Sequence, residues 1–199
     1  MKEASLYERT RETAKAVGLY DNMGKLIPAV RAAHIQVFIV PHHRWREGAY
    51  KGCDFCCWNL GSEFHPEFGP REGDVVVLEH WAQSGFANTD LDSQLKQRGI
   101  QKIILVGMTA NTCIEATARL GMDLGYHVTI IRDAIAASSH EGMHSVNEVN
   151  GPAFAHPILT TKELLACCLQ NRNENHNQIF YKPIIKQERE EYIYQRRGT

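Results

Sequence analysis

One cysteine, Cys113, stands where a hydrophobic run gives way to a helical pattern; the sequence from Val106 to Arg119 reads VGMTANTCIEATAR. A helix N-terminus offers free N–H groups and the positive end of the helix dipole, and both favour the thiolate of a cysteine placed there. The same N–H groups can hold the oxyanion that forms when a thiolate attacks a carbonyl carbon. The position predicts a nucleophilic cysteine; a buried structural cysteine is the alternative.

A second group of candidate residues follows another hydrophobic run: Glu79, His80 and Trp81, with Phe86 five residues further on. A histidine titrates near neutral pH, so His80 can move a proton or donate a hydrogen bond to a substrate carbonyl, and Glu79 is the other candidate base. Trp81 and Phe86 flank this position and are predicted to line the substrate pocket. An exposed His and Glu at a strand end are the alternative.

His42, beside His43, is a third candidate for substrate contact because it ends a hydrophobic strand. Two adjacent histidines lack the spacing of a metal site, so no metal is predicted there. The run 53–57 (CDFCC) and His65 supply zinc-ligand types without the paired CxxC of a structural zinc site, and a plain loop is favoured.

Hydrophobic periodicity indicates the elements that must position these residues. Helices are predicted over 21–33, 91–98, 114–124 and 161–169, and strands over 35–40, 74–78, 102–106, 128–131 and 158–159. Pro28 lies inside the first helical pattern, and the strand 102–106 is apolar on both faces and expected near the sheet centre. Alternating strands and helices predict a parallel sheet with its active site beyond the carboxyl ends of the strands.

The 199 residues are 43% hydrophobic and 23% charged, with a net charge of −1, which is typical of a globular protein and excludes nucleic-acid binding through bulk charge. The six cysteines do not form a secreted disulfide pattern, no apolar run is long enough to span a membrane, and the N-terminus is too charged for a signal peptide. The sequence therefore predicts a cytoplasmic protein without a membrane or nucleic-acid partner. No phosphate-binding glycine loop is present, so no cofactor is predicted.

Domain organisation is predicted from composition. Residues 1–169 are expected to form one domain, and 170–199 a polar linker and C-terminal tail, because 171–178 is polar and rich in Asn.

The stretch 102–133 closely resembles the signature of the isochorismatase-like cysteine hydrolases, and 84–91 (SGFANTDL) is similar to the segment that precedes it in that family. The resemblance covers roughly residues 20–168. It implies a three-layer α/β/α fold with a mainly parallel sheet and an Asp–Lys–Cys catalytic set in which Cys113 is the nucleophile. It also implies a cis peptide bond at Met108–Thr109 and an oxyanion hole made by the N–H groups of Thr109 and Cys113.

The chain departs from the family pattern at the other two catalytic positions. The lysine position is occupied by His80, or by Glu79 if the alignment shifts by one residue. Nothing in 1–20 matches the family's first strand and its aspartate, so that strand and its carboxylate are predicted to be missing.

Two functional hypotheses remain open from the sequence. The leading one is a cysteine hydrolase that uses Cys113 to cleave a small amide-type C–N bond in a small-molecule substrate. The alternative is a catalytically impaired pseudoenzyme that serves as an oligomer subunit or a binding protein. Members of the family commonly assemble, so a homo-oligomer is expected in either case.

Overall fold

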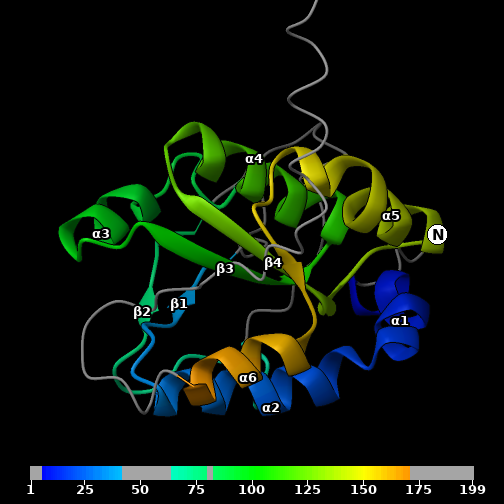
Figure 1. Ribbon diagram of the computed structural model, residues 1–199, viewed down its shortest axis with the longest axis horizontal. Coiled ribbons are helices and arrows are strands. Elements are labelled where there is room, and N and C mark those ends of the chain that lie inside the picture. Colours follow the sequence, from blue (N-terminus) through cyan, green and yellow to red (C-terminus); the bar gives the residue numbers. More distant parts are fainter. Residues whose placement is uncertain (1–5, 42–63, 80–82, 171–199) are drawn as a thin grey trace, which may run out of the picture.

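The protein is described by a computed structural model over residues 6–41, 64–79 and 83–170. Figure 1 shows three layers: α2 and α6 lie below the long strands, and α4 and α5 lie above them. The chain is therefore an α/β protein of three layers, as the sequence predicts.

Every strand pair is parallel. The strands are β1 (Phe38–Ile39), β2 (Val75–Val76), β3 (Lys102–Met108), β4 (His127–Ala136) and β5 (Ile158–Leu159). They form two groups, β1 with β2, and β3-β4-β5. The expected central position of strand 102–106 is wrong for the described residues, because β3 pairs there with β4 alone and β4 is the middle strand.

The helices are α1 (Leu6–Val17), α2 (Leu19–Ala32), α3 (Leu91–Gln97), α4 (Glu115–Asp123), α5 (His140–His144) and α6 (Thr161–Gln170). Two π-helical turns, η1 (Ala110–Ile114) and η2 (Ser145–Asn150), precede α4 and follow α5, and a short 3-10 helix, η3, covers Gly151–Ala153. The helices predicted at 21–33, 91–98 and 161–169 are confirmed, and Pro28 lies inside α2 without ending it. The described residues before β1 form α1, α2 and a short connection, and no strand occurs among them.

The strand predicted over 35–40 is shorter than expected because its first residues complete the end of α2. The Ile35 N–H donates to the Val30 carbonyl, and His34 adopts a left-handed conformation with φ of 56°. The helix end therefore uses the backbone groups that a longer strand would need, and β1 begins only at Phe38.

The core lies on both faces of β4. Val128 and Ile130 pack into the cluster on the α4 side, whereas Ile131 and Ala134 pack into the cluster that includes Leu26 of α2. Since Val128, Ile130 and Ile131 have no exposed surface, β4 needs a helical layer on each side.

β4 changes register beside β3, because Leu105 pairs with Ile130 whereas Gly107 pairs with Ile135. Within this irregularity lies Asp133, whose Oδ1 accepts hydrogen bonds from the Thr161 N–H at 2.7 Å and the Thr161 hydroxyl at 2.8 Å. The aspartate thus satisfies a free N–H at the start of α6 and fixes that helix to the sheet.

The Arg31–Asp74 ion pair ties α2 to the turn before β2. Arg31 Nη2 lies 2.5 Å from Asp74 Oδ2, and Arg31 Nε lies 3.2 Å from Oδ1. Burial alone would raise the pKa of the Asp74 carboxyl, but the bonds from Arg31 and from the Arg71 N–H together lower that pKa below its ordinary value.

Asp74→Asn is expected to lower the free energy of unfolding by about 1–3 kcal/mol at pH 7, because it removes a charged partner from Arg31. A carboxyl with a lowered folded pKa stabilises the protein above its unfolded pKa, about 3.9, and that stabilisation is lost as the pH falls through the folded value. Urea unfolding at pH 7 and pH 3 should show a smaller difference between wild type and Asp74→Asn at pH 3. Asp123→Asn, at the exposed end of α4, is the control and should change stability little.

Candidate active site

Cys113 lies in the first helical turn after β3. The peptide bond between Met108 and Thr109 is cis, as the resemblance implied. The helix begins earlier than predicted, at Ala110, and its first turn is of the wide π type. The Thr109 carbonyl accepts from the N–H groups of Thr112 and Ile114, so the Cys113 N–H is not one of its donors. Cys113 is a free, partly exposed thiol.

A chain of two threonine hydroxyls is hydrogen-bonded to the thiol of Cys113. The Thr109 and Thr112 hydroxyls are hydrogen-bonded to each other, and Thr112 Oγ1 donates to Cys113 Sγ at 3.7 Å. Thr109 is only 2% exposed. The turn therefore places a hydroxyl donor against the sulfur of Cys113.

Helix α1 covers the end of β3 where this turn begins. Thr10, which is fully buried, donates its hydroxyl to Met108 Sδ at 3.1 Å, and Thr13 donates to the Ala137 carbonyl at 2.5 Å. Met108 also packs against the cluster formed by Ala14, Leu19 and Ala136. The side chain of Met108, predicted at the site, therefore accepts a hydrogen bond from α1 and packs against it.

A close junction joins α4 to the segment 83–86. The Thr117 hydroxyl accepts from the Gly85 N–H at 2.9 Å and donates to the Cys113 carbonyl at 2.6 Å. A Cβ on Gly85 would come 2.8 Å from Cγ1 of Val40, at the end of β1. The chain just after Trp81, the chain just before His42 and the helix that carries Cys113 therefore meet at Gly85.

Glu79 is partly buried and lies just beyond β2, at the carboxyl end of that strand. The preceding residue is held in place, because the Leu78 N–H donates to Asp90 Oδ1 at 2.8 Å. This bond is the largest cause of the lowered pKa of Asp90, to which the Gln94 side chain also donates. Asp90 thus fixes the chain next to Glu79.

Phe86, predicted to line the pocket, lies in the core. It is 7% exposed, and its ring stacks on Tyr126 with centroids 5.6 Å apart. A Cβ on Gly121 would come 3.2 Å from the Phe86 ring, so α4 approaches it closely. The ring is thus a packing contact that holds segment 83–86 against the sheet.

Three predicted site residues, His42, His80 and Trp81, lie outside the described residues, as does the run 53–57. In the part of the chain that the structure describes, no cluster of three or more His, Cys, Asp or Glu side chains could hold a metal ion.

Sequence reasoning missed Thr112 and Thr117, which bond to Cys113, and Thr10 and Asp90, which bond to Met108 and Leu78. The bonds of Thr10 and Asp90 join residues distant in the sequence, so periodicity carries no signal for them. Thr117 could have been noticed, since a threonine four residues after Cys113 can reach its carbonyl in a helix.

Helix α5 packs on the other side of the Cys113 turn. A Cβ on Gly142 would lie 3.0 Å from Asn111 Nδ2 and 3.0 Å from the Ala137 Cβ. The Asn111 Oδ1 is buried and has no hydrogen-bond partner among the described residues. Two elements, α1 and α5, therefore contact the turn between Met108 and Cys113.

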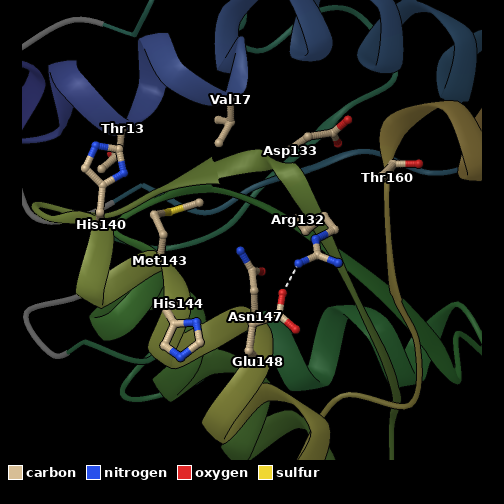
Figure 2. A pocket seen from close by; sticks show the side chains of 10 residues that line it. All are labelled: Thr13, Val17, Arg132, Asp133, His140, Met143, His144, Asn147, Glu148 and Thr160. Atoms are coloured by element: carbon tan, nitrogen blue, oxygen red, sulfur yellow. Dashed lines mark hydrogen bonds and ion pairs between the residues drawn. The ribbon is translucent and has the colours of Figure 1, made fainter.

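The described residues also form a cleft of about 370 Å³, but it does not contain the predicted site residues. It lies between α1 and α5, and Figure 2 shows Val17 and Met143 on its walls.

Comparison with known proteins establishes the family. The model of the isochorismatase domain matches residues 4–162, and the chain therefore belongs to the isochorismatase family. None of the helices within the described ranges is long and apolar enough to cross a membrane.

Two curated relatives illustrate the match. The chain is 43% identical over 81 residues to YwoC of Bacillus subtilis, an uncharacterized isochorismatase family protein, covering 40% of this chain and 42% of that protein. It is 40% identical over 89 residues to the ureidoacrylate amidohydrolase RutB of Klebsiella pneumoniae, covering 45% of this chain and 32% of RutB. The chain thus spans less than half the length of either relative.

Solved structures extend the similarity to the fold. An isochorismatase family protein from Burkholderia thailandensis has a TM-score of 0.66 and 29% identity, with 75% of this chain and 81% of that chain covered. The N-carbamoylsarcosine amidase of Thermoplasma acidophilum has a TM-score of 0.58 and 28% identity, with 76% and 86% covered.

The junction at Thr117 generates a prediction. Thr117→Val leaves the buried Gly85 N–H without its acceptor and should cost about 1–3 kcal/mol of stability, measured by urea unfolding. Thr117→Ser keeps the hydroxyl and loses one methyl group, about 0.8 kcal/mol. We expect iodoacetamide to alkylate Cys113 at the wild-type rate in the Ser variant and at a changed rate in the Val variant, followed by mass spectrometry of the Cys113 peptide. Equal rates in all three proteins would show that Thr117 does not position the thiol.

Proposed function

We propose that the protein is a cysteine hydrolase that cleaves a small amide-type C–N bond with the thiolate of Cys113. The observation that carries this proposal is the position of a free, partly exposed thiol in the first turn of a helix, with the Thr112 hydroxyl donated to its sulfur at 3.7 Å. A purely structural cysteine has no need of such a donor.

The proposed reaction has two steps. The Cys113 thiolate adds to the substrate carbonyl carbon, and the N–H groups of Thr109 and Cys113 hold the oxyanion. The C–N bond then breaks, the amine leaves with a proton, and an acyl-enzyme thioester remains. Water attacks the thioester, releases the carboxylic acid and returns the thiol.

The wide first turn of the helix supports this use of the Cys113 amide. The Thr109 carbonyl accepts hydrogen bonds from the Thr112 and Ile114 N–H groups and none from the N–H of Cys113. An oxyanion needs preorganised N–H donors that are directed at the reacting atom.

The proton carrier is proposed from Glu79 and His80. Glu79 follows the carboxyl end of β2, and Cys113 follows the carboxyl end of β3. His80 adjoins it, and either side chain can accept the thiol proton and later deliver it to the leaving amine.

The substrate class rests on two similar proteins. The names of RutB and of the Thermoplasma enzyme, a ureidoacrylate amidohydrolase and an N-carbamoylsarcosine amidase, both denote cleavage of C–N bonds. We therefore propose a small ureido or amide compound as substrate, with no cofactor taking part.

The nucleophile is tested by Cys113→Ala, with Cys167→Ala as the matched control because Cys167 is also free and partly exposed. Ammonia and amine release would be measured with ureidoacrylate, N-carbamoylsarcosine and simple carboxamides. We expect turnover that is abolished in Cys113→Ala and retained in Cys167→Ala. Turnover that survives in Cys113→Ala contradicts the mechanism. A folded wild type without turnover, in which Cys113 reacts with iodoacetamide no faster than Cys167, supports the pseudoenzyme alternative.

The base is tested with His80→Ala and Glu79→Gln. The variant that removes the general base should lower kcat by about 10²-fold or more and change the pH profile of kcat/KM between pH 5 and 9. A residue whose variant keeps the wild-type rate and profile across this range is not the base.

A further inference from the structure

A second place for a small molecule lies in the cleft between α1 and α5. Its volume is about 370 Å³, which is in the range of ligand pockets. Its walls carry Val17 from α1 and Met143 from α5, and its floor carries Arg132 from β4 (Figure 2). An apolar wall with a few polar groups is the usual composition of a site for a small molecule.

The polar groups that line this cleft include the donors of Arg132 and Asn147 and the carboxylates of Asp133 and Glu148. Figure 2 shows the Asn147 amide directed toward the middle of the cleft, between Met143 and Arg132, with its nitrogen foremost. The Asn147 Oδ1 is buried and has no hydrogen-bond partner among the described residues. His140, whose ring pairs with Glu12 at 3.3 Å, stands at the rim.

Arg132 has guanidinium N–H groups that are not bonded to Glu148. One terminal nitrogen is bonded to Glu148, and within the described ranges no hydrogen bond of its other nitrogens is found. After the hydrogen bonds from Thr160, the charge of Arg132 also helps to lower the pKa of Glu163, so this carboxylate lies within electrostatic reach. Both members of this pair are exposed, at 40% and 50%, and such a pair contributes little to stability. A guanidinium can donate two parallel N–H bonds to a carboxylate. A ligand carboxylate can therefore replace Glu148 at a small cost in free energy.

The second acidic side chain at the cleft, Asp133, is bonded to the start of α6. Its Oδ1 accepts both hydrogen bonds from Thr161, so one of its two oxygens is used within the fold.

From these groups we propose that the cleft binds a small carboxylic acid with an apolar body. The carboxylate lies on Arg132 and the Asn147 amide nitrogen, and the apolar body lies against Val17 and Met143. Neither the substrate nor the nucleophile of the proposed reaction enters this site.

The walls of the cleft continue to the turn that carries Cys113. On one side Thr10 of α1 contacts Met108, and on the other Gly142 of α5 lies against Asn111. A ligand that changes the spacing of α1 and α5 therefore acts on both ends of the turn, and it influences Cys113 to the extent that it binds the two spacings with different affinity. This influence rests on the proposed role of Cys113; binding itself does not.

The test uses cyclohexanecarboxylate, with cyclohexanecarboxamide and cyclohexylmethylamine as probes of the same shape but different charge. Binding to the full chain would be followed by NMR of the Met and Val methyl groups. We expect the carboxylate to shift the Met143 and Val17 methyl signals and to bind at least about tenfold more tightly than the other two probes. Equal binding of the three, or shifts elsewhere only, overturns the proposal.

Variants distinguish recognition from misfolding. Arg132→Gln and Asn147→Leu should each weaken carboxylate binding, and Lys96→Gln, which breaks an exposed ion pair on α3, should not. Glu148→Gln should strengthen binding because it releases Arg132, and a damaged fold cannot produce that gain. A Glu148→Gln protein that binds the carboxylate no more tightly than wild type contradicts the proposed contact.

The coupling is measured separately, as the alkylation rate of Cys113 relative to Cys167 with and without saturating carboxylate. We expect a change of at least about twofold in the ratio. An unchanged ratio in a protein that binds the carboxylate overturns the coupling and leaves the binding site standing. Failure of the Cys113→Ala test, by contrast, overturns the proposed function alone.

Discussion

The arrangement of this protein depends on one constraint: β4 must be buried on both faces. Its side chains Val128, Ile130 and Ile131 have no exposed surface, and successive residues point to opposite sides of the sheet. Burying them requires α4 on one side and α2 and α6 on the other (Figure 1). The same layers fix β3 beside β4, and the end of β3 places the turn with Cys113 at the edge of the sheet. The candidate site is thus a consequence of packing around a strand that itself supplies none of its predicted residues.

The sequence predicted those parts of the fold that rest on hydrophobic periodicity. Helices α2, α3 and α6 and the parallel strands follow this pattern, and the resemblance in 102–133 located the cis bond at Met108–Thr109. Helix α1 was not predicted, because two of its buried positions, Thr10 and Thr13, are polar and weaken the apolar stripe. The length of β1 was overestimated because the Ile35 N–H is used by the end of α2.

The sequence predicts Cys113 as the centre of the candidate site, and the contacts around it come from the structure. Cys113 could be identified because it occupies a helix start after a strand, a position with recognisable chemistry. Its support from Thr112, Thr117 and Gly85 depends on side-chain hydrogen bonds and on a close approach to Val40, and no pattern of residue types encodes those contacts. The sequence carries no signal either for the burial of Phe86, whose ring stacks on Tyr126 in the core.

The division of the strands into two groups has a mechanical consequence. Within the described ranges, no backbone ladder joins β1-β2 to β3-β4-β5, and apolar side chains such as Val37 and Ile104, packed with Leu26 of α2, hold the groups together. Hydrogen-bonded ladders fix a register, whereas apolar contacts are non-directional and permit small sliding movements. Within the described residues, the strand ends that precede Glu79 and Cys113 therefore belong to two separately laddered groups. The spacing of these two strand ends is set by side-chain packing rather than by a shared strand register.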